Sequence, residues 1–247
     1  MICSTPAFVL KTFDFRETSK IVVFYSKEVG KFKGLLKGIR RDPKKFSSSL
    51  SPLSFNHIVF YRKRASDLHL VSQCDLLDDF GLMRPDLKSF GFSCHVAELV
   101  DLLMPLEDTN KDVFELLSFF LKTLSENRQD TRYIFQIKIL TLSGFKPHLD
   151  SCLSCESKIL KDAFFSYAKG GLLCSRCLYQ DKNAEPILQG VISTILYIEK
   201  NYWQSCLRIN MISSVKKQLE RILDCFVRFH IGKSLKTNRL VHDFLDL

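Results

Sequence analysis

The sequence lacks the marks of exported, membrane-spanning and common hydrolytic proteins. No apolar run approaches the ~18 residues that a membrane-spanning helix needs, and the first residues form neither the basic nor the apolar stretch of a signal peptide. The six histidines form no His-Glu-x-x-His or His-x-Glu motif, and no Gly-x-Ser-x-Gly is present. Gly232-Lys233-Ser234 ends like a phosphate-binding loop, but Val227 occupies the position of that loop's first glycine. We therefore expect a cytoplasmic protein that has no membrane partner and is not an enzyme.

A disulfide framework is also missing, because the nine cysteines are odd in number and five of them are scattered singly, as in a reducing compartment. The other four form two Cys-x-x-Cys pairs with 18 residues between them: Cys152 and Cys155, then Cys174 and Cys177. Such pairs let two turns share one ion, and four thiolates complete the closed tetrahedral shell of a structural zinc site. We predict one zinc ion per chain. Two disulfides, an iron–sulfur cluster or a chance group of buried thiols are the alternatives, and His148 is a further candidate ligand.

Positive charge is abundant and unevenly distributed. The net charge is +9, and residues 1–80 carry 14 Lys and Arg against 8 Asp and Glu, a net of +6. Basic residues gather on two expected loops and on the expected strand that leads into the first loop, where they could follow the phosphates of a nucleic acid. The candidate set is Lys33, Lys37, Arg40, Arg41, Lys44, Lys45, Arg62, Lys63 and Arg64. Phe32, Phe46, Phe60 and Tyr61 lie among these cations, although core packing is the expected role of Phe32 and Phe60. The alternative is a solvated charged loop over an ordinary core.

The residue pattern changes from strand-like to helix-like near residue 80. Residues 7–13, 20–26, 31–37, 53–61 and 68–76 are rich in β-branched and aromatic residues and predict five strands. Apolar residues at helical spacing then predict helices over 87–102, 113–124, 133–142, 187–198 and 211–229. We predict an α+β chain: a five-stranded OB-fold barrel at 1–80, then a helical domain at 81–247 with a zinc-ribbon-like insertion at 148–180. An SH3-like barrel or an open meander is the alternative for the first domain.

The order of several short stretches resembles the bacterial RecO family along nearly the whole chain. The stretches are Phe8-Val9-Leu10-Lys11-Thr12, Phe15-Arg16-Glu17-Thr18-Ser19, Gly30-Lys31, Leu36-Lys37-Gly38-Ile39-Arg40-Arg41, Leu50-Ser51-Pro52-Leu53, Leu99-Val100-Asp101, Leu142-Ser143-Gly144-Phe145-Lys146-Pro147, the four cysteines and His230-Ile231-Gly232-Lys233-Ser234-Leu235-Lys236. Each stretch is modest alone, but their order and spacing together are specific.

The resemblance implies a mediator of recombinational DNA repair. RecO-like proteins bind single- and double-stranded DNA, anneal complementary strands, work with RecR and recognise the acidic tail of the single-stranded-DNA-binding protein SSB, so that RecA can load. Lys233, Lys236 and Arg239 are candidates for a basic rim that receives this tail. Two other functions are weighed against this one. The first is a zinc-stabilised adaptor that binds only proteins, and the second is a zinc-dependent nucleic-acid enzyme.

Overall fold

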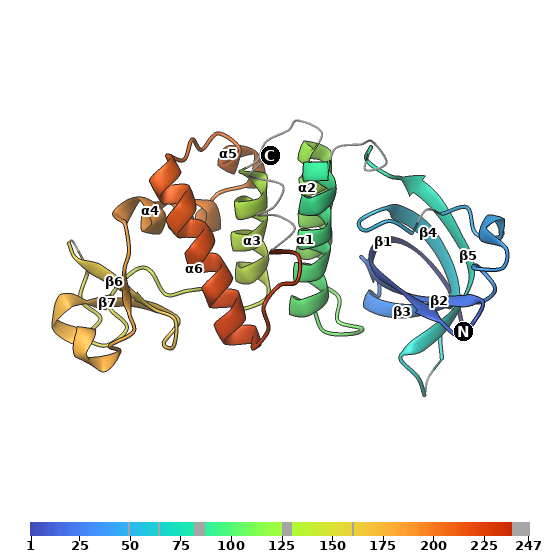
Figure 1. Cartoon of the computed structure of the whole chain (residues 1–247), viewed down its shortest axis with the longest axis horizontal. Helices are drawn as coiled ribbons and strands as arrows, with labels where there is room; N and C mark the ends of the chain where they lie inside the picture. Colours follow the sequence, from blue (N-terminus) through green and yellow to red (C-terminus); the bar gives the residue numbers. More distant parts are fainter. Residues whose placement is uncertain (49, 64, 82–86, 125–129, 160, 239–247) are drawn as a thin grey trace. The chain divides into compact units, whose positions relative to one another are not determined.

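The structure is a computed structural model that describes all residues except 49, 64, 82–86, 125–129, 160 and 239–247 (Figure 1). Backbone contacts divide the chain into two units, residues 1–128 with 236–247 and residues 129–235. The domain boundary predicted near residue 80 stays a prediction. None of the described helices is both long and apolar enough to span a bilayer.

The first unit begins with a closed barrel of five strands. These are β1 (Ile2–Phe15), β2 (Ser19–Ser26), β3 (Gly30–Leu36), β4 (Phe55–Tyr61) and β5 (Leu68–Asp78), in the barrel order β1-β2-β3-β5-β4. β1 is long because its first half pairs with β4 and its second half with β2, with an irregularity between Val9 and Lys11. A parallel pairing of β3 with β5 closes the barrel. The predicted five-stranded, OB-like barrel is therefore confirmed.

Aromatic rings fill the barrel interior. Phe32 lies between Phe24 and Phe60, with ring centroids 5.3 and 4.7 Å apart, and all three are essentially inaccessible to solvent. His69 is also fully buried and stacks on Phe60 at 5.4 Å. Burying such rings contributes most of the free energy that holds a small barrel together. The core role expected for Phe32 and Phe60 is what the structure shows.

Two helices complete the first unit: α1 (Leu87–Leu103) and α2 (Lys111–Leu124). The loop between them runs against the start of β3, where Gly30 has φ +71° and a Cβ would lie 1.9 Å from the carbonyl oxygen of Asp108. Only glycine fits this close approach. The next residue, Lys31, reaches α1, where its Nζ donates to the main-chain oxygen of Asp101 at 2.5 Å and lies 3.5 Å from that residue's carboxylate.

The second unit contains α3 (Thr131–Leu142), α4 (Gln189–Lys200), the short α5 (Trp203–Cys206) and α6 (Ser213–Ile231). α6 buries one apolar face, which includes Leu219, Leu223 and Phe226. It ends at Gly232, which takes the left-handed conformation and donates its N–H to Arg228. The glycine that looks like part of a phosphate-binding loop is therefore a helix C-cap.

A small three-stranded sheet is inserted between α3 and α4. It consists of β6 (Ala163–Ser166), β7 (Gly171–Cys174) and β8 (Glu185–Pro186), and the 3-10 turn η2 (Ser175–Gln180) follows β7. Phe165 of β6 is fully buried and meets Phe226 of α6, with centroids 6.1 Å apart. A β-hairpin, β6 with β7, thus lies between the two cysteine pairs, and its apolar side packs on the last long helix.

Candidate nucleic-acid interface and cysteine cluster

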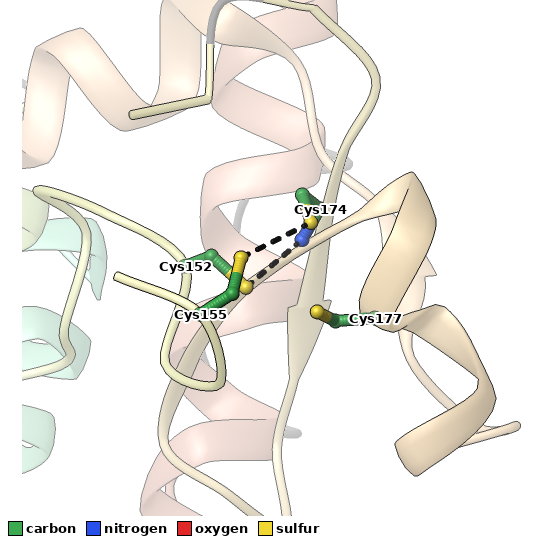
Figure 2. A group of neighbouring side chains, drawn as sticks. All are labelled: Cys152, Cys155, Cys174 and Cys177. Atoms are coloured by element: carbon green, nitrogen blue, oxygen red, sulfur yellow. Dashed lines mark hydrogen bonds between the residues drawn. The ribbon is translucent and has the colours of Figure 1, made fainter. Parts of the chain in front are cut away.

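The four cysteines of the two Cys-x-x-Cys motifs meet at one end of the inserted sheet (Figure 2). Cys152 and Cys155 lie on a tight turn, in which Glu156 donates its N–H to Cys152 O at 2.9 Å. β7 delivers Cys174, whose N–H donates to Cys152 Sγ at 3.4 Å, and η2 carries Cys177. Each Cys-x-x-Cys pair therefore bends its backbone so that both sulfurs face the same space.

The sulfur geometry suits a single ion. All four Sγ atoms lie within 4.8 Å of one another, and Cys155 Sγ is 3.8 Å from Cys174 Sγ. Tetrahedral sites with metal–sulfur bonds of about 2.3 Å place their sulfurs about 3.8 Å apart. All nine cysteines are described and free, so no disulfide joins any of them. These four residues could hold a metal ion, whereas His148 is exposed, hydrogen-bonds Ser151 and is not part of the group.

Cys155 is the exposed member of the cluster. A hydrogen bond with the Ser157 hydroxyl, at 2.9 Å, is the main reason that the pKa of its thiol falls to about 6. Metals bind thiolates rather than thiols. The surroundings therefore favour the ligand form of this residue.

The basic loop between β3 and β4 projects its cations while anchoring itself through apolar residues. Ile39 and Phe46 are buried in the barrel core. Between them, the 3-10 turn η1 (Pro43–Lys45) is capped by Asp42, whose carboxylate accepts the Lys44 N–H at 3.2 Å. The backbone thus holds a fixed arch. Lys37, Arg41 and Lys44 are exposed on it or next to it, and they make no ion pair with a described residue.

Two of the predicted DNA-binding cations, Arg40 and Lys45, already make contacts within the protein. Arg40 donates to the main-chain oxygen of Arg16 at 3.2 Å and lies 3.7 Å from the carboxylate of Asp14. Lys45 donates to the main-chain oxygen of Lys37 at 2.9 Å. Both side chains remain exposed, but part of their hydrogen-bonding capacity shapes the loop.

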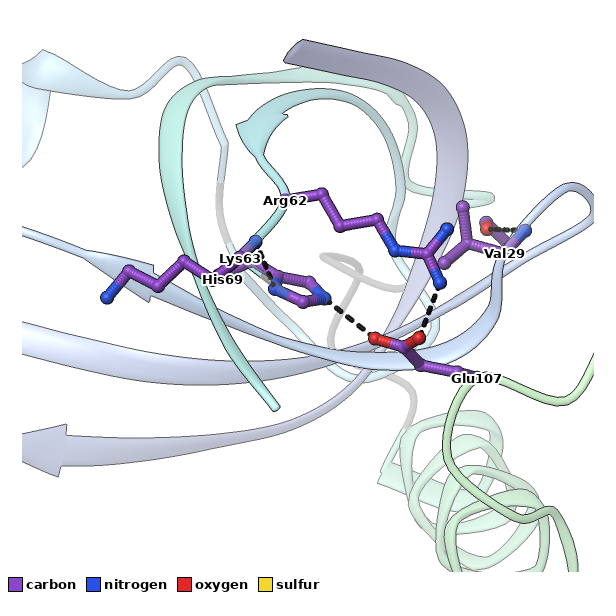
Figure 3. Close-up of polar contacts among 6 residues, drawn as sticks. Val29, Arg62, Lys63, His69 and Glu107 are labelled. Carbon is purple, nitrogen blue, oxygen red and sulfur yellow. Dashed lines mark hydrogen bonds and ion pairs between the residues drawn. The ribbon is translucent and has the colours of Figure 1, made fainter. Parts of the chain in front are cut away.

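The turn between β4 and β5 is tied to the α1–α2 loop (Figure 3). The Arg62 guanidinium donates to the carboxylate of Glu107, whose other oxygen lies 3.0 Å from His69 Nε2. These contacts, the hydrogen bond from Arg62 first, lower the pKa of Glu107. Lys63 is exposed, while Arg64 lies outside the described residues. Arg62 is therefore already paired with an acid, which the sequence did not indicate.

The aromatic residues near the cations divide into buried and exposed groups. Phe32, Phe46 and Phe60 are buried, so of the four aromatics interleaved with the basic loops only Tyr61 is exposed, at 45%. Sequence reasoning missed Phe13, which is 43% exposed on β1 with the Lys11 ammonium 4.7 Å from its ring centroid. Strand alternation alone would have placed Phe13 inside with Val9, and the irregularity after Val9 reverses this.

The candidate partner-binding residues are only partly described. Lys233 is exposed just after α6, and Lys236 is exposed with its main-chain N–H donating to Glu98 of α1 at 3.0 Å. Arg239 lies outside the described residues. Their joint role stays a prediction.

Comparisons with known proteins identify relatives over nearly the full length. The family described as "Recombination protein O N terminal" matches residues 1–80, and "Recombination protein O C terminal" matches residues 84–239. The chain is 28% identical to "DNA repair protein RecO" of Syntrophus aciditrophicus, over 97% of this chain and 95% of that one. It is 29% identical to the protein of the same name from Shouchella clausii, over 98% and 94%. The corresponding protein of Acetivibrio thermocellus is 27% identical, over 93% and 92%.

Proposed function

Because this chain belongs to the RecO family of DNA repair proteins, we propose that it binds single- and double-stranded DNA, anneals complementary strands and, with RecR, helps RecA to load onto SSB-coated single strands. A role in recombination repair follows from the family. DNA as the direct ligand, annealing and the individual partners are our proposal.

The observation that carries DNA binding is the cationic arch on the barrel. Lys37, Arg41 and Lys44 are exposed there on a backbone fixed by Ile39 and Phe46, which are buried. Exposed cations on an anchored backbone, with no acidic partner among the described residues, suit phosphates, because each contact releases condensed counterions from the nucleic acid. Two strands held by such a surface repel each other less, which favours annealing.

The other predicted cations contribute unequally in this proposal. Lys33 pairs with Leu68 at the start of β5, and Lys63 lies in the turn that precedes β5, so both can contribute there. Arg40 and Lys45 can add charge while shaping the loop. Arg62 contributes least, since Glu107 already neutralises it.

Zinc is the metal that the cysteine cluster fits best, one ion held by Cys152, Cys155, Cys174 and Cys177. When bound, a zinc ion with four thiolate ligands supplies a closed cross-link without an open coordination position. The four cysteines then fix the turn before β6 to the end of β7 and to η2. We assign them a structural role, consistent with a protein that is not an enzyme and acts in the cytoplasm.

The acidic tail of SSB is the partner that we propose for the exposed Lys233 and Lys236. Charge attraction at a solvent-exposed rim mainly speeds association and sets orientation. We expect salt to weaken this interaction, and we expect the double variant Lys233→Glu with Lys236→Glu to weaken it as well.

The test is binding of fluorescent single-stranded and duplex DNA at several salt concentrations. Arg41→Glu with Lys44→Glu should lower affinity for both forms by roughly tenfold or more and reduce the single-strand salt slope by about 1.4, the share of two phosphate contacts. Lys169→Glu with Lys182→Glu is the matched control, since both lysines are exposed in the second unit. Equal losses in both variants would show that only net charge matters. Absence of binding by the unaltered protein would instead favour the protein-binding adaptor.

A further inference from the structure

One row of outward-facing side chains crosses every strand of the barrel and contains only apolar or aromatic residues. The strand register pairs Phe13 with Ile21, Ile21 with Leu35, Leu35 with Leu70, Leu70 with Tyr61, and Tyr61 with Ile2. We call these six residues the outer row.

The side chains of Ile21, Leu35, Leu70 and Tyr61 point away from the core, because a strand neighbour of each points into it. Phe13 and Ile2 share that face because they pair directly with Ile21 and Tyr61. Val22 next to Ile21, His69 next to Leu70 and Phe60 next to Tyr61 are each fully buried. No member of the outer row is buried, and Phe13, Tyr61 and Ile2 are 43%, 45% and 63% exposed. Since alternate residues of a strand face opposite sides, the whole row lies on the outer surface.

Contiguity makes this row unusual. A single exposed apolar residue is normal on a protein surface, but a contiguous series usually marks a binding site. Directly paired residues on neighbouring strands have Cβ atoms about 5 Å apart, so the outer row forms a continuous track across the strands. It reaches from near the β1–β2 turn, through Phe13, to the β4–β5 turn, which follows Tyr61.

The charges beside the outer row indicate what occupies it. Lys33 precedes Leu35 by two residues on β3, and the exposed Lys37 comes directly after the end of that strand, so a cation lies on each side of Leu35 along the chain. On β1, the Lys11 ammonium lies over the Phe13 ring. A polyanion that carries flat apolar groups matches this arrangement, whereas a purely apolar protein segment would leave the lysines unpaired. Single-stranded nucleic acid has that chemistry.

We propose that the outer row is a base-stacking track, on which Phe13 and Tyr61 stack unpaired bases while Lys11, Lys33 and Lys37 hold the neighbouring phosphates. This inference rests on the proposed DNA binding and adds to it the residues that select unpaired strands. Bases in a duplex are already stacked on each other and cannot lie flat on the rings. Stacking is also tolerant of sequence, because every base has an aromatic face.

The experiment compares single-stranded oligothymidylate with a blunt duplex, using the full chain. Phe13→Ala with Tyr61→Ala should weaken single-strand binding by about tenfold for each ring removed, with less than a twofold change for the duplex and an unchanged salt slope. Tyr61→Phe with Phe13→Tyr keeps both rings and should bind like the unaltered protein. Tyr179→Ala with Phe229→Ala removes one tyrosine and one phenylalanine from the second unit, where both are more exposed than Tyr61 and Phe13, and should have no effect.

The possible outcomes distinguish base stacking on the outer row from DNA binding as such. If the double alanine variant of the outer row binds single strands normally while Arg41→Glu with Lys44→Glu does not, the track is wrong and DNA binding stands. Equal losses for single strands and duplex would also overturn base stacking. If the unaltered protein binds neither form, both proposals fail. Hydrogen exchange of the barrel strands in each variant verifies that the fold is intact.

Discussion

The ion pair between Lys31 and Asp101 should stabilise the first unit far more than a surface pair does. The Lys31 side chain is 11% exposed and that of Asp101 is 24% exposed, with Nζ 3.5 Å from the carboxylate and 2.5 Å from the main-chain oxygen of Asp101. Burial lowers the pKa of Lys31, and Asp101 partly offsets this. Lys31→Met keeps most of the apolar stem and removes the charge, so it isolates the polar interaction.

The magnitude follows from opposing contributions. At 3.5 Å and an effective dielectric of 20 the attraction is about 5 kcal/mol, and several kcal/mol of this is offset by the desolvation of the ammonium. Removing Lys31 also leaves a carbonyl and a partly exposed carboxylate without their donor. We expect Lys31→Met to cost about 2 to 3 kcal/mol, less than the loss of a fully buried pair. The double variant Lys31→Met with Asp101→Ala should lose about 1 to 2 kcal/mol less stability than the sum of the losses in the two single variants.

The assay must report on the first unit. The single tryptophan, Trp203, lies in the second unit, so its fluorescence does not follow the barrel. Native-state hydrogen exchange of peptides from β2 and β3 measures the opening free energy there directly. Lys27→Met is the matched control, because its pair with Glu115 has the same 3.5 Å distance but side chains 40% and 54% exposed, and it should cost less than about 0.5 kcal/mol. Equal effects of Lys31→Met and Lys27→Met would refute the reasoning.

Two further predictions concern the stability of the fold at alkaline pH and the metal bound by the cysteine cluster. Burial raises the pKa of the Tyr25 hydroxyl to about 12. The stabilisation by this residue is therefore complete below pH 10 and is lost as the pH rises towards 12, by up to about 3 kcal/mol. Tyr25→Phe should flatten this decline in hydrogen exchange measured at pH 9 and above. Metal analysis should find about one zinc ion per chain. Cys155→Ser should abolish zinc binding and lower the stability of the inserted sheet. Cys225→Ser, outside the cluster, should retain the metal, and an equally stable metal-free chain would contradict the zinc assignment.

The strands and helices could be predicted because their signals are local. Ile58 and Phe60 alternate with half-buried or exposed neighbours on β4, and a glycine follows the apolar face of α6 at its end. The start of β1 was missed by five residues. Ile2 to Pro6 form a strand only because β4 lies beside them, and pairing with a segment more than 50 residues away leaves no local pattern.

The parts of the site that escaped prediction depend on contacts between distant residues. The irregularity after Val9 turns Phe13 outward, although both residues fall on the same side of a regular strand. Arg62 looks like any other loop cation in the sequence, yet Glu107, 45 positions away, neutralises it. Composition therefore indicated the sign and the region of the charge, while the tertiary structure decides which cations remain unpaired.

Once the paired cations are set aside, charge and apolar surface converge on β3 and the loop that follows it. Lys33, Lys37, Arg41 and Lys44 make no ion pair with a described residue, and Leu35 of the outer row lies between the first two. Phosphate contacts weaken steeply with salt, whereas stacking on rings does not. The two contributions should therefore separate along a salt titration. Loop variants should lose affinity mainly at low salt, and the single-strand affinity that persists at high salt should depend on the rings of the outer row.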